Sequence, residues 1–140
     1  MIHQQSIGVA NWTVGINGFD GILGLGPVDL TMGTTSNTFE VPTVMDNLYN
    51  QRTISQEVLG IFFSPDSESD HNGNGELTFG GYDNSVITSS VNYVPLTTTF
   101  PASEFWGIEQ SISYDNVTVL SSTAGIVDTG TTLILIATGE

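Results

Sequence analysis

Short apolar runs separated by turn residues dominate the pattern of the chain. Many of these runs alternate apolar and polar positions, and clusters of Gly, Asn, Asp, Ser and Pro lie between them. This pattern is typical of β-strands joined by tight turns. The sequence therefore predicts an all-β (mainly β) fold class, with strands expected at residues 6–14, 21–26, 58–64, 76–81, 89–96, 106–114, 117–122, 125–129 and 132–137.

One segment, residues 41–55, has helical spacing instead. Val44, Leu48 and their neighbours Met45 and Tyr49 form one apolar face, and Pro42 stands near the start, where a helix tolerates proline. The most polar and irregular join is "GGYDNSVITSS", residues 80–90. We therefore expect two parts, 1–85 and 86–140.

The charge balance is strongly acidic. Fifteen Asp and Glu face a single basic side chain, Arg52, and the net charge is −14 at pH 7. Nucleic acid is therefore an unsuitable partner, because nothing could neutralise its phosphates. Below about pH 3 most carboxylates are protonated, so self-repulsion is small in acid and large at neutral pH. The charge suits a protein that works in acid, although an ordinary solvated acidic surface explains it as well.

Composition narrows the class further. With 140 residues, 39% apolar residues and mean hydropathy +0.10, the chain is long enough for one globular core. No apolar run approaches the ~18 residues of a membrane helix, so we expect no membrane partner. The first ten residues lack the features of a signal peptide. The chain has no Cys, which excludes disulfides and thiolate metal sites.

Two stretches imitate ligand-binding loops. Asp70, Asn72, Asn74 and Gly75 match the first half of a calcium loop, but Gly81 stands where a bidentate Glu is required. The Asn-Gly pairs of the same stretch predict a tight hairpin turn. "GILGLG", residues 21–26, reverses the glycine order of a dinucleotide-binding loop and is followed by proline. Neither stretch supports a metal or a nucleotide, and we expect no cofactor.

Other candidate sites are few. His71 stands alone in a loop, so neither a Ser-His-Asp triad nor a His-based metal site can be assembled. Asn11 and Asn116 each begin an acceptor sequon for N-glycosylation, which matters only if the protein is secreted.

The stretch "GIVDTGTT" carries the clearest chemistry. An apolar strand delivers Asp128 to a turn made by Thr129 and Gly130, and hydroxyls at Thr131 and Thr132 can hold the carboxylate or the loop. An Asx-type turn in a hairpin accounts for these residues about as well as a catalytic aspartate does.

The wider sequence favours catalysis. "IVDTGTT" resembles the Asp-Thr-Gly motif of pepsin-like aspartic proteinases, in the form found in their second lobe. Three further stretches upstream of this motif match the family in the right order: "FDGILGLG", "VPTVMDNLYNQRTIS" and "GELTFGGYDNSVITSSVNYVPL". Trp106 stands where the family has its "YW". "QSIGVA", "GPVDLT" and "LSSTAGIVDTGTTL" look most like a basidiomycete member. The resemblance covers essentially the whole chain.

The resemblance implies a bilobal pepsin-like acid-protease fold, incomplete in this chain, and an aspartic endopeptidase in which two aspartates activate a water. Asp128 would be one of the catalytic acids, and Thr129 would brace the active-site loops. The remaining residues would bind substrate: Gly130 and Thr131 by hydrogen bonds, Thr132 in support, and Phe19 and Ile22 as pocket lining, with core packing an equal alternative for the last two.

The Asp-Thr-Gly motif occurs once, at Asp128. We therefore expect the middle of a proteinase, inactive alone: 1–85 as the second half of the N-terminal lobe and 86–140 as the interlobe strand and first half of the C-terminal lobe. The first Asp-Thr-Gly would lie upstream of Met1.

The family resemblance also implies peptide or protein substrates and inhibition by pepstatin-type compounds. It implies a monomeric full-length enzyme that is secreted or located in an acidic compartment. The alternatives are a non-catalytic secreted β-domain that acts as a binding module and, less favoured, a homodimer to which each chain gives one aspartate.

Overall fold

The computed structural model describes residues 1–15, 18–36, 39–65 and 75–137. Its regular elements are the helix α1 (Val44–Asn50), two antiparallel hairpins and three short 3₁₀ helices. The hairpins pair β1 (Leu59–Phe63) with β2 (Gly75–Phe79), and β3 (Gly107–Tyr114) with β4 (Val117–Ile126). The 3₁₀ helices are η1 (Val28–Thr31), η2 (Asn84–Val86) and η3 (Ala102–Glu104). Strand exceeds helix, which confirms the mainly β class.

The helix α1 lies within the segment predicted to be helical. A capping box begins it: the Asp46 backbone N–H donates to Thr43 Oγ1 at 3.2 Å, and the Thr43 N–H donates to Asp46 Oδ2 at 2.7 Å. The helix ends where Arg52 takes a left-handed conformation, with φ 57°. Residues 59 to 63 then pair in register with residues 75 to 79.

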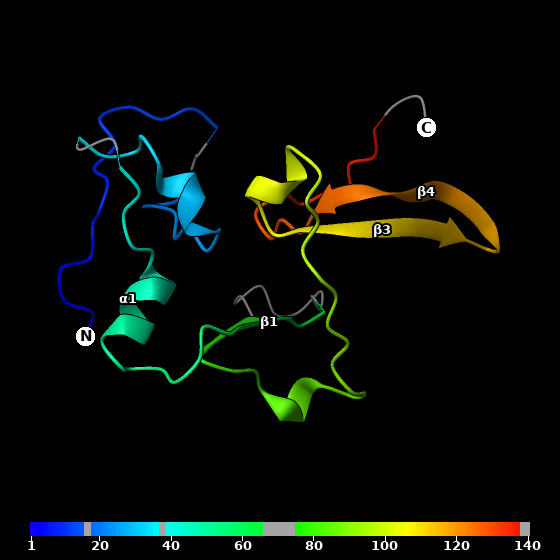
Figure 1. Ribbon diagram of the computed structural model, residues 1–140, viewed down its shortest axis with the longest axis horizontal. Coiled ribbons are helices and arrows are strands. Elements are labelled where there is room, and N and C mark those ends of the chain that lie inside the picture. The colour runs from blue at the N-terminus through cyan, green and yellow to red at the C-terminus, as the bar shows by residue number, and fades with distance from the viewer. Residues whose placement is uncertain (16–17, 37–38, 66–74, 138–140) are drawn as a thin grey trace.

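The β3–β4 hairpin is the longest regular structure and is joined by a two-residue turn. Asp115 and Asn116 have φ values of 47° and 63°, and Tyr114 pairs with Val117. Two central residues with positive φ are the requirement of a type I′ turn, which matches the twist of the strands. In Figure 1 this hairpin extends away from α1, with its turn at the edge of the molecule.

Four predicted strands are absent. Residues 6–14, 21–26, 89–96 and 132–137 form no β-ladder, and of residues 125–129 only the first two belong to β4. Alternating side chains favour an extended backbone, but a strand also needs a neighbour to accept and donate its hydrogen bonds. The described part of the chain provides no such neighbour for these segments. The predicted turn at residues 72–75 and the calcium-loop residues from Asp70 to Asn74, with His71, lie outside the described residues, apart from Gly75 at the start of β2.

The buried core is small. Among the described residues only Thr97, Ala102, Gly107 and Leu120 are buried, and all four lie in or beside the β3–β4 hairpin. The accessible surface is 11583 Å², against about 7,000 Å² for a compact protein of this mass. Within the described ranges, no helix is long and apolar enough to cross a membrane.

Candidate active site

Asp128 lies just beyond the end of β4, in a turn that fixes both of its carboxylate oxygens. The Gly130 backbone N–H donates to Oδ1 at 2.8 Å, and the Thr131 hydroxyl donates to Oδ2 at 2.6 Å. A Cβ on residue 130 would lie 3.2 Å from Oδ1, so glycine lets the carboxylate stay close to the backbone. The Asx-type turn considered from the sequence is therefore present, and it leaves the carboxylate exposed to solvent.

These hydrogen bonds set the acidity of the group. The Thr131 hydroxyl and then the Gly130 N–H stabilise the ionised form, and they hold the pKa of Asp128 below its ordinary value of 3.8 despite slight opposing desolvation. An exposed, ionised carboxylate can accept a proton from water or from a second carboxylic acid. Among the described residues, no group of three His, Cys, Asp or Glu could hold a metal ion beside it.

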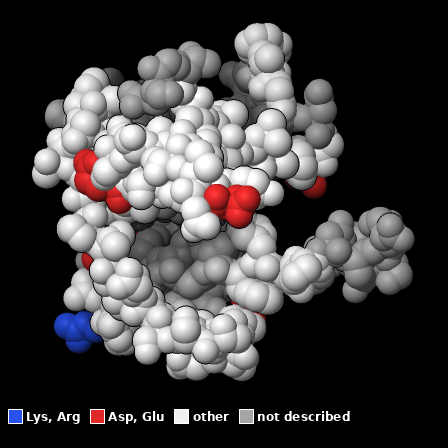
Figure 2. All heavy atoms as spheres, turned by 90° about the vertical axis from the view of Figure 1, so that its right-hand side faces the viewer, with Lys and Arg blue, Asp and Glu red and all other residues white. Residues whose placement is uncertain are grey.

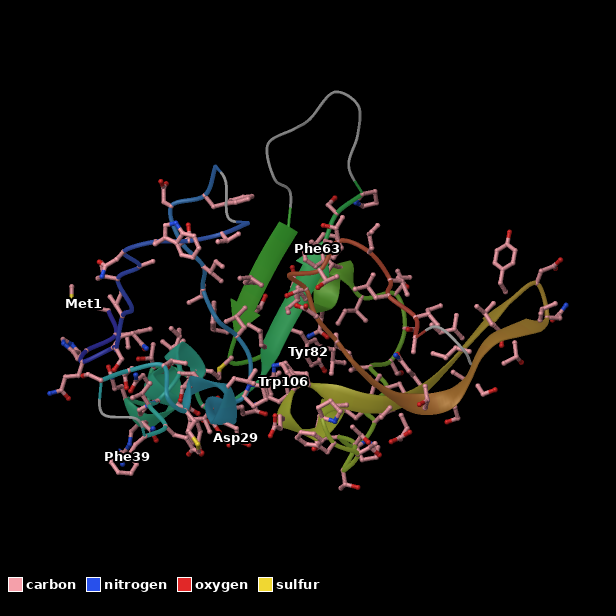
Figure 3. All side chains as sticks on the ribbon, turned by 90° about the horizontal axis from the view of Figure 1, so that it is seen from above. Met1, Asp29, Phe39, Phe63, Tyr82 and Trp106 are labelled. Atoms are coloured by element: carbon pink, nitrogen blue, oxygen red, sulfur yellow. The ribbon has the colours of Figure 1, made fainter. Side chains whose placement is uncertain are left out.

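Trp106 connects this turn with a segment far away in the sequence. Its indole Nε1–H donates to the Leu25 carbonyl at 2.8 Å, and its own carbonyl accepts from the Val127 N–H at 2.9 Å. Leu25 belongs to the "GILGLG" segment, and Val127 directly precedes Asp128. Figure 3 shows Trp106 towards the middle of the molecule, whereas Met1 and Phe39 lie at its edge. Trp106 therefore links two of the segments singled out from the sequence.

The structure brings together only part of the predicted site. Asp128, Gly130 and Thr131 are in direct contact, whereas the side chains of Thr129 and Thr132 are exposed without a hydrogen bond to another described residue. Phe19 and Ile22 are each 76% exposed, which excludes packing in the core of the described structure.

Sequence reasoning named Trp106 only by its resemblance to the family's "YW" and missed its connection to the Asp128 turn. The hydrogen bond from its indole joins residues 81 positions apart. No local pattern encodes such a pair, and the only available signal was a polar aromatic side chain directly before a strand.

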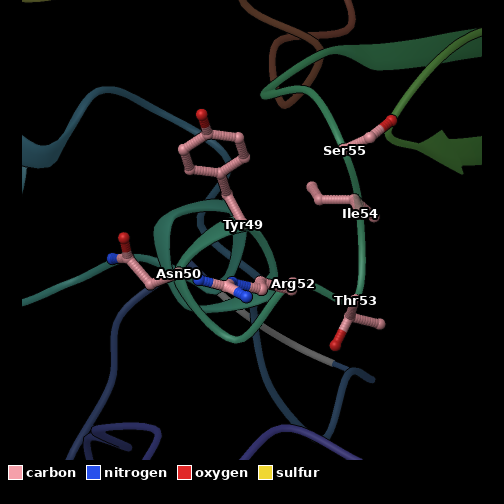
Figure 4. Close-up of a pocket in the computed structure, with 6 residues that line it drawn as sticks. All are labelled: Tyr49, Asn50, Arg52, Thr53, Ile54 and Ser55. Atoms are coloured by element: carbon pink, nitrogen blue, oxygen red, sulfur yellow. The ribbon is translucent and has the colours of Figure 1, made fainter.

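A surface hollow of about 580 Å³ lies elsewhere, at the carboxyl end of α1. Tyr49, Asn50, Arg52, Thr53, Ile54 and Ser55 line it, as Figure 4 shows. It contains none of the predicted catalytic residues and no carboxylate. The Asp128 turn is the better candidate for the active site, because it holds a carboxylate with two defined hydrogen-bond donors, whereas the hollow offers only its concave shape.

Comparison with known proteins identifies the relationship. The family model described as eukaryotic aspartyl protease matches residues 1–140. The chain belongs to the eukaryotic aspartyl protease family. It is 56% identical over 139 residues to polyporopepsin of Irpex lacteus, covering 97% of this chain and 41% of that protein.

More distant members of the family agree. Rhizopuspepsin-1 of Rhizopus niveus is 37% identical and cathepsin E of Rattus norvegicus 38% identical, covering 84% and 83% of this chain and 28% and 27% of theirs. The crystal structure of the aspartic proteinase from Irpex lacteus superposes with a TM-score of 0.87 at 57% identity, covering 96% of this chain and 40% of that one. These findings confirm the predicted family, its pepsin-like fold and the likeness to a fungal member. The chain spans about two fifths of the length of polyporopepsin.

Proposed function

We propose that this chain supplies one of the two catalytic aspartates, Asp128, to an aspartic endopeptidase that hydrolyses peptide bonds in acid. The observation that carries the proposal is the Asp128 carboxylate, held by Gly130 and Thr131 in an exposed turn of a chain that matches the aspartyl protease family over its whole length. In aspartic proteases two such carboxyl groups share one proton, because two like charges side by side cannot both remain ionised.

The chemistry needs one carboxylate and one carboxylic acid. The carboxylate takes a proton from a water as that water attacks the peptide carbonyl, and the acid donates a proton to the carbonyl oxygen. Asp128 suits the carboxylate role, because the Thr131 hydroxyl and the Gly130 N–H both favour its ionised form. The second aspartate would come from another Asp-Thr-Gly, since these 140 residues contain one.

We assign the remaining roles on the family resemblance. Thr129 would brace the two active-site loops, and Gly130, Thr131 and Thr132 would hold the substrate backbone. Phe19 and Ile22, both exposed, would line the pocket before the scissile bond. Residues 1–85 would belong to the N-terminal lobe, and residues 86–140 to the interlobe strand and the C-terminal lobe.

Peptides or proteins would be the substrates, and pepstatin-type compounds the inhibitors, of a monomeric enzyme that is secreted or located in an acidic compartment. The acidic surface supports work at low pH. In the space-filling view acidic groups are visible at several places, and Arg52, the single Lys or Arg side chain of the sequence, lies at the edge of the molecule (Figure 2).

The test is Asp128→Asn in the full-length proteinase that carries this sequence. We expect peptide hydrolysis at acid pH to be lost, because an amide can neither take up nor share the proton. Asp83→Asn is a matched control, since its carboxylate also accepts from a backbone N–H and a hydroxyl, both of Ser85, at 2.7 and 2.8 Å. Undiminished turnover in Asp128→Asn would show that Asp128 is not a catalytic acid, whereas a wild-type protein without turnover would favour the alternative, a non-catalytic β-domain.

A further inference from the structure

The sequon at Asn116 lies at the tip of the β3–β4 hairpin. Asn116 follows Asp115 in the two-residue turn, and Thr118, the third residue of the sequon, lies in β4. Asparagine adopts the left-handed conformation found here, φ 63°, at less cost than most residues. The Asn116 side chain is exposed, and no hydrogen bond to another described residue occupies its amide.

The side chains around this turn form an unusual surface. Tyr114 and Val117 are a directly paired couple, so their side chains lie on the same face of the hairpin, and Val119 follows on that face two residues later. Their exposed fractions are 79%, 65% and 47%, whereas Leu120, which pairs with Ile112 beyond an irregularity in the register, is buried at 6%. The tip of the hairpin thus carries exposed apolar side chains, and they begin beside the acceptor asparagine.

We propose that Asn116 carries an N-linked oligosaccharide whose first sugars pack over Tyr114 and Val117. An N-linked glycan is bulky and soluble and needs a surface site, which the projecting turn provides (Figure 1). Sugar rings present C–H groups on one side, and covering an exposed aromatic ring with them removes apolar area from water. The inference rests on the secretory location proposed above but not on catalysis.

Asn11 provides the internal comparison. It begins the second sequon, with Trp12 and Thr13, in a segment without regular structure, and Trp12 is 82% exposed. No turn fixes Asn11 relative to that aromatic ring, so a glycan there would have no defined apolar surface to cover. We therefore expect only the Asn116 glycan to stabilise the fold.

Glycan occupancy at Asn116 is tested by expressing the full-length chain with a secretory leader in yeast. Wild type, Asn116→Gln, Thr118→Ala and Asn11→Gln are compared by gel mobility before and after endoglycosidase and by peptide mass spectrometry. Both secreted and cell-retained material is analysed, so that poor folding does not hide the modification. We expect Asn116 to be glycosylated in wild type and Asn11→Gln, and unmodified in the other two variants. An unmodified Asn116 in chains whose leader has been removed would overturn the proposal.

The covering of Tyr114 is tested on the full-length secreted protein by thermal unfolding before and after the glycan is removed. We expect removal of the glycan to lower the unfolding midpoint of the wild type by roughly 2–4 °C. In Tyr114→Ala the same removal should lower the midpoint much less, because the ring that the sugars cover is absent. Tyr93→Ala is the control, because Tyr93 is 74% exposed but lies outside the hairpin. In this variant glycan removal should lower the midpoint as much as in the wild type. An equal fall of the midpoint in wild type and in Tyr114→Ala would show that the sugars do not pack on Tyr114. Because neither measurement uses proteolysis, failure of the proposed enzyme function would not affect the result.

Discussion

At the scale of single residues, hydrogen bonding alone does not distinguish a catalytic aspartate from a structural one. Asp83 and Asp128 both accept one backbone N–H and one hydroxyl, and both have a lowered pKa. They differ in their surroundings: Asp83 caps the 3₁₀ helix η2, whereas Asp128 follows a strand and is placed by the bond from Val127 to Trp106. The assignment of Asp128 therefore depends on the family as well as on geometry.

Replacing Thr131 by Val should raise the pKa of Asp128 towards 3.8, because the largest stabilising contact of the ionised form is lost. The measurement is an NMR titration of the Asp128 carboxyl carbon. Thr132→Val is the control, since the Thr132 hydroxyl makes no hydrogen bond to Asp128 in the described structure. Equal pKa values in wild type and Thr131→Val would contradict the role of the hydroxyl.

The lowered pKa of Asp128 also makes the stability of the protein depend on pH. A group whose folded pKa is lowered stabilises the fold above its unfolded pKa, and that contribution is lost as the pH falls through the folded value. For Asp128 and Asp83 the loss therefore occurs below about pH 3.8. Thr131→Val should weaken the pH dependence in that acid window alone.

At the scale of elements, the start of β3 packs against the few buried residues. The Thr97 N–H donates to the Gly107 carbonyl at 2.9 Å, and the Thr97 hydroxyl donates to Glu109 at 2.5 Å. A Cβ on residue 107 would lie 2.2 Å from the Ala102 carbonyl oxygen and 2.8 Å from Thr97 Cγ2. Only glycine fits where residue 97, η3 and β3 meet.

Gly107→Ala should accordingly destabilise the protein by about 1–3 kcal/mol, because relief requires the backbone of η3 to move. Urea unfolding of the full-length protein measures this change. In Gly81→Ala the added methyl meets nothing within 4 Å, so that variant should unfold nearly as wild type does. If both variants unfold at the same urea concentration, the close packing at β3 is not maintained in solution.

At the scale of the whole molecule, apolar surface remains uncovered. Leu133, Ile134 and Leu135 are 71–84% exposed, and Trp12 and Tyr93 are exposed to a similar degree. Apolar patches of this kind on a protein surface are normally covered by another part of a protein. The described structure therefore presents faces that in a stable molecule pack against something else.

Expressed by itself, the 140-residue chain should show no proteinase activity and should be poorly folded or associated. It contains one Asp-Thr-Gly, and its small core cannot offset the entropy of ordering the chain. An acid peptidase assay combined with light scattering tests both points. A monodisperse, pepstatin-sensitive protease would falsify this prediction and support a homodimer in which each chain gives one aspartate.

The full-length protein should be more stable near pH 4 than near pH 8. The net charge of −14 in this part of the chain is repulsive at the higher pH, and partial protonation reduces it at the lower. Thermal midpoints across this range at low salt should fall as the pH rises, and added salt should reduce the slope. A midpoint that rises towards pH 8 would show that repulsion does not govern the pH dependence.

The features that the sequence determined by itself are local. The helix α1, the β3–β4 hairpin and the Asp128 turn depend on partners only a few residues apart: Thr43 with Asp46, the turn at Asp115 and Asn116, and Thr131 with Asp128. Such contacts form wherever the right side chains occur at short spacing, so a pattern is sufficient to predict them.

Long-range partners were decided only by the tertiary structure. "GILGLG" looks like a strand, yet in the described structure it forms no ladder, and its Leu25 carbonyl is bound by the indole of Trp106. The apolar character of Phe19 and Ile22 likewise did not indicate that both side chains are exposed. A strand or a core needs a second surface, and which distant segment provides it is set by the path of the whole chain rather than by the composition of either segment.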